Sequence, residues 1–177
     1  MLICYIAVDG TDIPLLPLHI LRDASIMAGT NILAGSVSNE TSLFIDSSHP
    51  TTMAAPIFNV LVKLMYGEKS GDARQVYPET AGVLEDQKDR LVDLSSDSLF
   101  TCPLMEATEK LKGAASVYSY YFEAPWLGGL NESQGNLCKG KACHTTDLVF
   151  LLSEPDNGMY RIEKVSTLII EKSDNLY

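Results

Sequence analysis

The sequence predicts an α/β fold, in which a mostly parallel sheet is flanked by helices. Two segments, 24–37 and 115–125, have the composition of buried strands, since they are apolar and rich in glycine or in β-branched and aromatic residues. Between them, apolar residues recur at helical spacing over 54–66 and 100–113. Strands that alternate with helices along a chain are typical of parallel pairing.

Length and charge limit the classes of protein to be considered. At 177 residues the chain has the size of one ordinary domain. Its 13 Lys+Arg and 23 Asp+Glu give a formal net charge of −10, so phosphate backbones and anionic lipid surfaces would repel it. Nucleic acid is therefore excluded as the main partner. The apolar residues 1–8 are too short to span a bilayer and have no basic residue before them, so we expect neither a transmembrane segment nor a signal peptide there.

Each expected strand is followed by a polar segment. Over 24–37, Gly29 and Gly35 punctuate an apolar run that fits a buried parallel strand better than an amphipathic helix. A turn-forming polar stretch comes next. The segment 115–125 reads ASVYSYYFEAP, and a long loop rich in Gly, Asn and Ser then leads to His144.

Three helices are expected between these strands. The helix over 54–66 has Pro56 near its first turn. The residues expected to pack its inner face on a core are Ile57, Val60, Leu61, Leu64 and Met65. A short exposed helix is expected over 84–91. The next helix, over 100–113, would be capped by Thr101.

Two cysteines, Cys138 and Cys143, enclose a small loop directly before His144. A local disulfide, free thiols and a zinc site are the three readings of this spacing. Zinc sites usually have four ligands from two clusters, and the other histidines, His19 and His49, stand alone in the sequence. We therefore favour the disulfide and predict no metal site and no cofactor.

The topology brings a carboxylate and an imidazole to one edge of the predicted sheet. Glu40 follows the first strand and His144 follows the loop after the second. The carboxyl ends of parallel strands share one rim, which is where open α/β sheets place their sites. A carboxylate that accepts a hydrogen bond from one imidazole nitrogen leaves the other free to take a proton from a serine hydroxyl. This pair would act as an oriented general base.

Five short segments in the span 5–152 resemble, in order and with plausible gaps, the C-terminal part of the type-B carboxylesterase and cholinesterase family of α/β-hydrolases. They are AVDGTDIPLLP, LAGSVSNETSLF, DSLFTCPLMEA, SVYSYYFEAP and CKGKACHTTDLVFLL. The second resembles the family's Gly-x-x-x-x-Glu-Gly-x-x-Phe turn, which is matched at Gly35, Glu40 and Phe44. The last resembles the Cys-His-Gly-x-Glu-Leu-Pro-x-Phe segment that carries the histidine.

This resemblance implies a fold and an activity. The fold would be a partial α/β-hydrolase over 1–152, that is, the C-terminal part of the mostly parallel sheet with its flanking helices and without the N-terminal half. Residues 153–177 would be a divergent tail. Glu40 and His144 would be the acid and the base of a Ser-His-Glu triad. The reaction would be hydrolysis of a small-molecule carboxylic ester through an acyl-serine intermediate.

Four positions near these residues depart from the family pattern. Thr41 follows the acid and Thr145 follows the histidine, where the family usually has glycine. Asp147 stands in place of a glutamate, and Val149 in place of a proline. A position that needs a positive φ is destabilised when its glycine is lost. We therefore expect altered backbone geometry beside the site.

The chain contains no Gly-x-Ser-x-Gly motif and no glycine-rich oxyanion segment. In the family both lie N-terminal to every segment matched here. Ester hydrolysis is therefore expected of a full-length form, whose serine comes from an upstream half or from another chain. The alternative is a non-catalytic chain, either a truncated remnant or a cholinesterase-like binding or adhesion module without the nucleophile. For the isolated chain we expect marginal stability, because a divided sheet has an unpaired hydrophobic edge.

Two sequons for N-glycosylation begin at Asn39 and Asn131. The first overlaps the turn that carries the acid and is expected to be too buried for modification. Asn131 lies in the long polar loop and is the candidate site. The cysteines are compatible with a secreted parent protein, although the sequence alone identifies no compartment and no oligomeric state.

Overall fold

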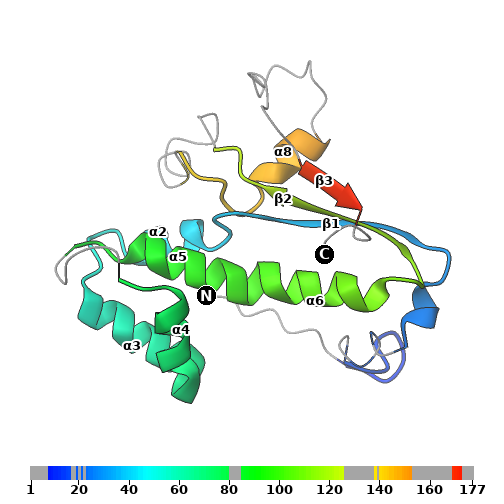
Figure 1. Ribbon diagram of the computed structural model, residues 1–177, viewed down its shortest axis with the longest axis horizontal. Coiled ribbons are helices and arrows are strands. Elements are labelled where there is room, and N and C mark those ends of the chain that lie inside the picture. The colour runs from blue at the N-terminus through cyan, green and yellow to red at the C-terminus, as the bar shows by residue number, and fades with distance from the viewer. Residues whose placement is uncertain are drawn as a thin grey trace.

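The computed structural model describes residues 8–16, 19, 21, 23–79, 85–125, 138, 140–152 and 169–172. A three-stranded sheet has a long helix along one face and a short helix at the other, and further short helices lie at one end of the long helix (Figure 1). In chain order the described elements are η1 (Ala24–Met27), β1 (Asn31–Val37), α2 (Ser42–Ser48), α3 (Ala55–Tyr66), η2 (Gly67–Lys69), α4 (Ser70–Val76), α5 (Lys88–Ser96), η3 (Asp97–Thr101), α6 (Cys102–Leu111), β2 (Ser116–Phe122), α8 (Thr146–Leu152) and β3 (Ile169–Lys172).

The sheet has the order β1-β2-β3 and is mixed in direction. β1 and β2 are parallel, with Gly35 opposite Tyr120 and Val37 opposite Phe122, whereas β3 runs antiparallel to β2. The parallel pair and its helical connection confirm the α/β class in this small form. The first strand is shorter than predicted, because 24–27 form a 3-10 turn that begins where the Asp23 carboxylate accepts the Ser25 N–H.

The long helix that covers the sheet consists of α5, the π-helical turn η3 and α6 without a break (Figure 1). Inside it, the Cys102 N–H bonds to the Asp97 carbonyl, five residues back. The predicted cap at Thr101 is therefore wrong: this residue lies within the helix and makes no capping hydrogen bond.

The expectation of a short exposed helix over 84–91 is also wrong. α5 begins at Lys88, whose N–H bonds to the Asp86 carboxylate at 3.1 Å. Its buried residues are Leu91, Val92, Leu94, Ser95 and Ser96. All of them except Leu91 follow the predicted end of the helix, so most of the inner face was outside the segment for which exposure was predicted.

The main core lies between α3 and α5 rather than under the predicted face of α3. Phe58 and Val62 are fully buried against Met53, Leu91 and Leu94. Four of the five residues predicted to face the core are exposed instead, namely Ile57, Val60, Leu64 and Met65. α3 is apolar on more than one side, so periodicity alone could not decide which side packs inward. A second cluster joins Val37, Phe122 and Ala142 near the carboxyl ends of β1 and β2.

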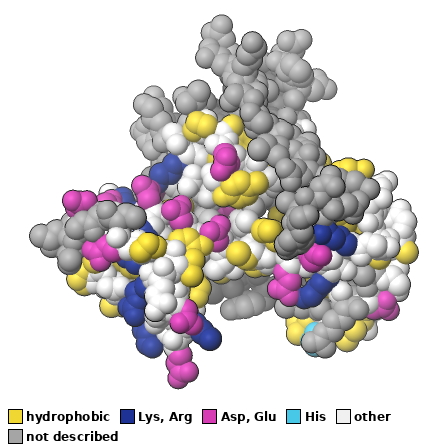
Figure 2. All heavy atoms as spheres, in the orientation of Figure 1, with side chains coloured by type: hydrophobic (Ala, Val, Ile, Leu, Met, Phe, Trp, Pro, Cys, Tyr) yellow, Lys and Arg dark blue, Asp and Glu magenta, His cyan; other side chains and the backbone are white. Residues whose placement is uncertain are grey.

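Apolar and acidic side chains are interspersed on the surface seen in Figure 2. Within the described ranges β1 pairs with β2 alone, and Leu33 on β1 is 55% exposed. Among the helices that the structure describes, none has both the length and the apolar character needed to cross a membrane.

The packing of α3 predicts opposite outcomes for two adjacent positions. Phe58→Ala should lower the free energy of unfolding by about 3–5 kcal/mol, because it removes a fully buried ring from the core. Ile57→Ala is the matched control and should change it by less than about 0.5 kcal/mol, since Ile57 is 47% exposed. Urea unfolding followed by circular dichroism measures both. A larger loss for Ile57→Ala would mean that the predicted face is the packed one.

Candidate functional site

The acid position is built where β1 ends. Glu40 lies in the turn between β1 and α2, and its Oε1 accepts the Val37 N–H at 3.0 Å. Its Oε2 lies 2.6 Å from Nδ1 of His144, so the imidazole N–H donates to the carboxylate. Only 9% of the Glu40 side chain is exposed. A buried carboxylate held by a backbone N–H and an imidazole has one orientation, which fixes the imidazole in turn.

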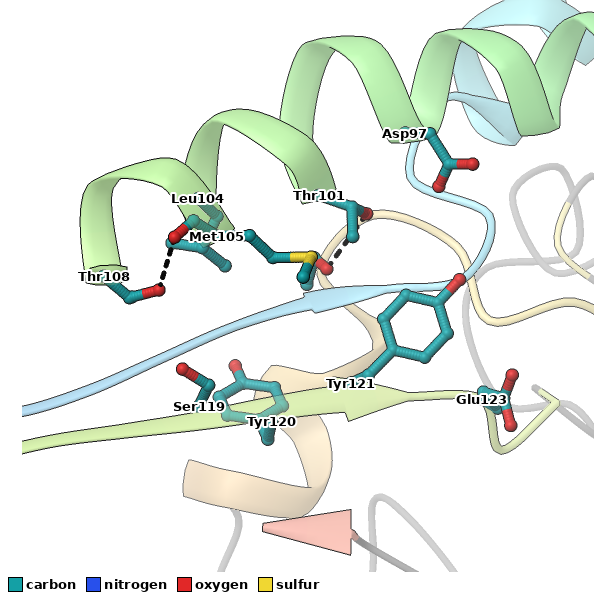
Figure 3. A pocket seen from close by; sticks show the side chains of 10 residues that line it. Asp97, Thr101, Leu104, Met105, Thr108, Ser119, Tyr120, Tyr121 and Glu123 are labelled. Atoms are coloured by element: carbon teal, nitrogen blue, oxygen red, sulfur yellow. Dashed lines mark hydrogen bonds between the residues drawn. The ribbon is translucent and has the colours of Figure 1, made fainter. Parts of the chain in front are cut away.

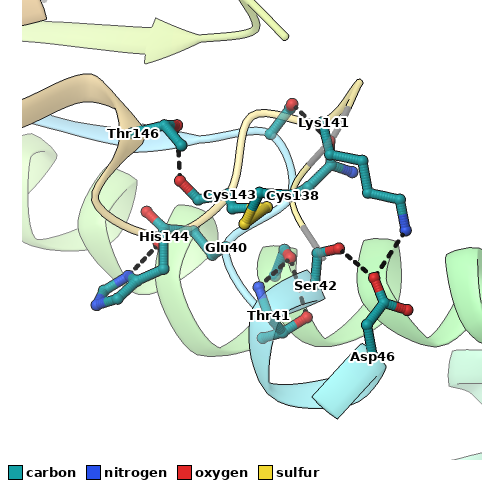
Figure 4. Close-up of a disulfide and its surroundings, with 12 residues drawn as sticks. Glu40, Thr41, Ser42, Asp46, Cys138, Lys141, Cys143, His144 and Thr146 are labelled. Atoms are coloured by element: carbon teal, nitrogen blue, oxygen red, sulfur yellow. Dashed lines mark hydrogen bonds and ion pairs between the residues drawn. A yellow bond between two sulfur atoms is a disulfide. The ribbon is translucent and has the colours of Figure 1, made fainter. Parts of the chain in front are cut away.

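The loop before His144 is closed on itself by a disulfide and is joined to the acid turn by backbone pairing (Figure 4). Cys138 and Cys143 form a disulfide, as favoured from the sequence, so their thiolates are not available to zinc. The Asn39 N–H bonds to the Ala142 carbonyl at 2.9 Å, and Asn39 forms an isolated parallel bridge with Cys143. The loop therefore approaches the sheet as a short extension of its pairing pattern.

An ion pair holds the outer side of the same loop. The Lys141 ammonium lies 3.2 Å from Oδ2 of Asp46 on α2 and 2.9 Å from Oδ1 of Asp89 on α5. Burial works to lower the pKa of Lys141, but the hydrogen bonds to Asp89 and Asp46 outweigh it and raise that pKa above its usual range. Lys141 thus stays charged and connects the disulfide loop to two helices.

The imidazole of His144 contacts two aromatic rings and is partly open to solvent. The ring centroids of Phe44 and Phe100 are each 5.6 Å from that of His144. Phe100 belongs to the π-helical turn η3, and π-helical turns within α-helices are frequent at functional sites. The His144 side chain is 39% exposed, and within the described part of the chain its Nε2 has no hydrogen bond. This nitrogen is the one free to exchange a proton.

The two threonines that replace family glycines differ in backbone conformation. Thr41 has φ of −88° and is fully integrated: its N–H bonds to Ser96 Oγ and its hydroxyl donates to the Val92 carbonyl, both at 3.1 Å. Thr145 has φ of 73°, which is the left-handed region that favours glycine. The strain expected where a glycine with positive φ is replaced is therefore found after the histidine and not after the acid.

Several residues beside the site were missed by sequence reasoning. Tyr120 donates a hydrogen bond to Asp147 Oδ2 at 2.6 Å, and Phe100 packs on the imidazole. The glycine opposite Tyr120 in the first strand was a signal for this contact, since a glycine in a strand often marks the close approach of a neighbouring side chain. Val149 lies in α8, and Asn131 lies outside the described residues.

A separate pocket of about 450 Å³ lies between α6 and the β1–β2 face (Figure 3). Ser36 and Thr101 close one part of it, with their hydroxyl oxygens 3.2 Å apart. The Ser119 hydroxyl is buried there and has no hydrogen-bond partner among the residues that the structure describes. Burial and the nearby Asp97 raise the pKa of Tyr121, which also lines the pocket. No group of His, Cys, Asp and Glu suited to a metal occurs in the described ranges.

Comparison with known proteins decides the family. The family model described as the carboxylesterase family matches residues 1–170. The chain belongs to the carboxylesterase family. The match includes both segments that meet in the Glu40–His144 hydrogen bond, so the site geometry is that of a carboxylesterase-family chain.

One curated relative extends this result. "Crystal protein" of Dictyostelium discoideum is 23% identical over 154 residues, which are 86% of this chain and 27% of that protein. This carboxylesterase-family chain therefore spans about a quarter of the length of the relative that it matches.

The two threonines predict effects of opposite sign. Thr41→Gly should lower the free energy of unfolding by about 1–3 kcal/mol, because it removes buried hydrogen bonds at a position with ordinary φ. Thr145→Gly should raise it by about 0.5 kcal/mol, since relief of the left-handed strain exceeds the added entropy of the unfolded chain. Chemical unfolding of the two variants measures the difference. Equal signs would contradict the assigned backbone conformations.

Proposed function

We propose that this chain supplies the acid and the base of a carboxylic ester hydrolase, with Glu40 as the acid and His144 as the general base. The observation that carries the proposal is the hydrogen bond of 2.6 Å from His144 Nδ1 to a buried carboxylate. A carboxylate so placed selects the tautomer with a proton on Nδ1 and stabilises the imidazolium that forms during catalysis. Membership of the carboxylesterase family supports the choice of ester hydrolysis as the reaction.

The proposed reaction is an acyl transfer in two halves. Nε2 of His144 takes the proton of a serine hydroxyl as the serine oxygen bonds to the ester carbonyl carbon. The imidazolium then gives this proton to the leaving alkoxide, and an acyl-serine and an alcohol result. Water repeats the sequence: His144 takes its proton, the new C–O bond forms, and the serine recovers its proton as the carboxylic acid leaves. Glu40 stays ionised throughout.

The serine and the oxyanion donors would come from outside this chain. None of its 177 residues lies in a Gly-x-Ser-x-Gly motif. We place the missing part of a partial α/β-hydrolase fold beside β1, whose second edge is unpaired within the described ranges and whose Leu33 is exposed. A strand added there would extend the parallel sheet and cover apolar surface. The marginal stability expected of the isolated chain follows from the same edge and stays a prediction.

The alternative function is non-catalytic binding, in a remnant or an adhesion module of the same family. The absence of the nucleophile motif from the sequence favours it for these 177 residues taken alone. In that case the Glu40–His144 hydrogen bond would only stabilise the loop. The two functions are distinguished by whether a serine-bearing segment accompanies the chain.

Kinetics of the parent protein test the proposal. Translation upstream of Met1 should reveal Gly-x-Ser-x-Gly, and that longer protein should hydrolyse a small aryl ester. His144→Ala should lower its kcat by about 10⁴-fold or more, and Glu40→Gln by about 10³–10⁴-fold, because the imidazole loses its orientation. His49→Ala is the matched control, since the side chain of this half-buried histidine bonds only to neighbouring Ser48 among the described residues.

The 177-residue chain by itself should show no ester hydrolysis above background. Turnover by the purified chain that disappears in His144→Ala would contradict the need for an external serine. A parent protein with the serine motif and no effect of His144→Ala would contradict the role of the base.

A further inference from the structure

A side-chain strut connects the sheet to the helix that follows His144. Tyr120 lies in β2, directly opposite Gly35 on β1. Its hydroxyl donates to Oδ2 of Asp147, the second residue of α8, at 2.6 Å. Both strands and α8 are thereby joined through one phenol ring. Asp147 is 8% exposed, so this hydrogen bond is shielded from water.

Gly35 is what allows the ring to take this path. A Cβ added at Gly35 would lie 2.4 Å from three carbons of the Tyr120 ring, well inside van der Waals contact. Its backbone does not require a glycine for conformational reasons, because it has no positive φ. The glycine therefore serves the close approach of the tyrosine.

His144 lies between two anchors of different kinds. On its N-terminal side are the disulfide at Cys143 and the backbone bridge to Asn39. On its C-terminal side, the first turn of α8 is joined to the sheet by Asp147 and Tyr120. The only residues between His144 and Asp147 are Thr145 and Thr146, so a movement of Asp147 reaches the imidazole through a very short link.

That link stores backbone strain. Thr145 has φ of 73°, and such a conformation of a β-branched residue persists only where surrounding contacts enforce it. Thr146 helps to enforce it, since its N–H and its hydroxyl bond to the Cys143 carbonyl at 3.0 and 2.7 Å. The other enforcing contact is the hydrogen bond that the Asp147 carboxylate accepts from the Tyr120 hydroxyl. If it were lost, Thr145 could relax to negative φ and move His144 away from Glu40.

We propose that Tyr120 and Asp147 are positioning residues that hold His144 in hydrogen-bond register with Glu40, with Gly35 as the space that the strut requires. This inference rests on the proposed function of His144 as a base and adds the elements that orient it. Neither residue touches the reacting atoms.

The charges around the strut agree with a fixed neutral phenol. Burial, the hydrogen bond to Asp147 and the charges of Asp147 and Glu40 raise the pKa of Tyr120 above its usual range. The phenol therefore remains a hydrogen-bond donor across the working pH range of a hydrolase. Exchange of its O–H for a hydrogen removes the strut and leaves the ring in place.

The experiment reads the imidazole directly, without ester hydrolysis. Nitrogen-15 NMR of the histidine side chains, recorded at about pH 9 where an ordinary imidazole is neutral, reports which ring nitrogen carries the proton. In the full chain, His144 should show the tautomer protonated on Nδ1 and a slowly exchanging Nδ1–H. Tyr120→Phe and Asp147→Ala should each give a mixture of tautomers and at least about fivefold faster exchange of this proton, as for loss of one hydrogen bond.

Matched variants separate positioning from general stability. Tyr118→Phe removes a hydroxyl from the same strand and the same face, at an exposed position, and should leave the His144 spectrum unchanged. Thr145→Gly in the Tyr120→Phe background should restore the Nδ1–H tautomer, at least in part, because glycine holds the left-handed conformation without the strut. Gly35→Ala should reproduce the Tyr120→Phe spectrum.

An unchanged His144 tautomer and exchange rate in both Tyr120→Phe and Asp147→Ala would overturn the inference. Should either variant unfold, the spectrum of Tyr120→Phe with Thr145→Gly decides, since a folded double variant with the wrong tautomer also overturns it. The proposed function fails separately: a parent protein without esterase activity would leave these spectra as they are. Conversely, if the parent protein is an active esterase but the His144 spectrum is unchanged in both variants, only the positioning role of Tyr120 and Asp147 is overturned.

Discussion

The hydrogen bond between Glu40 and His144 is the interaction on which the site depends, and it joins residues 104 positions apart. Neither side chain lies in a regular element. The carboxylate sits in the turn after β1, and the imidazole sits in the loop before α8. A contact between two loops is maintained only when both are fixed to a rigid scaffold. The surrounding contacts can be understood as the interactions that fix these two loops to the scaffold.

The parallel pairing of β1 and β2 is the first of them. Because parallel strands end at the same edge, the turn after β1 and the chain after β2 leave the sheet side by side, and the Ser38 N–H continues the pairing to the Phe122 carbonyl. The cluster of Val37, Phe122 and Ala142 packs directly beneath that edge. The disulfide then closes the loop on itself, and Lys141 joins the outer part of the loop to two helices.

The long helix contributes from the other side. Two residues of its π-helical turn reach the site region, since Phe100 contacts the imidazole and the Thr101 hydroxyl contacts that of Ser36 on β1. Ser95 and Ser96, one turn earlier, surround the Thr41 hydroxyl beside the acid. These two serines of α5 therefore form part of the support of the acid turn. Buried hydroxyl groups that satisfy one another make this support specific in geometry.

The sequence by itself determined the fold class, the existence of the strand pair and of the α3 and α6 helices, the family resemblance, and the meeting of Glu40 with His144. These follow from local composition, from motif order and from the rule that parallel strands share a rim. It could not determine the inner face of α3, because that helix carries apolar residues on several sides and only its partner α5 selects Phe58 and Val62.

Tertiary structure alone decided the details that orient the base. Thr41 fits its position because it bonds to a helix more than fifty positions away in the chain. Thr145 is strained because its backbone has a positive φ. The strut from Tyr120 to Asp147 exists because the register places Gly35, and no other residue of β1, beneath the ring. Such contacts are set by the three-dimensional alignment of elements, and local sequence carries no record of that alignment.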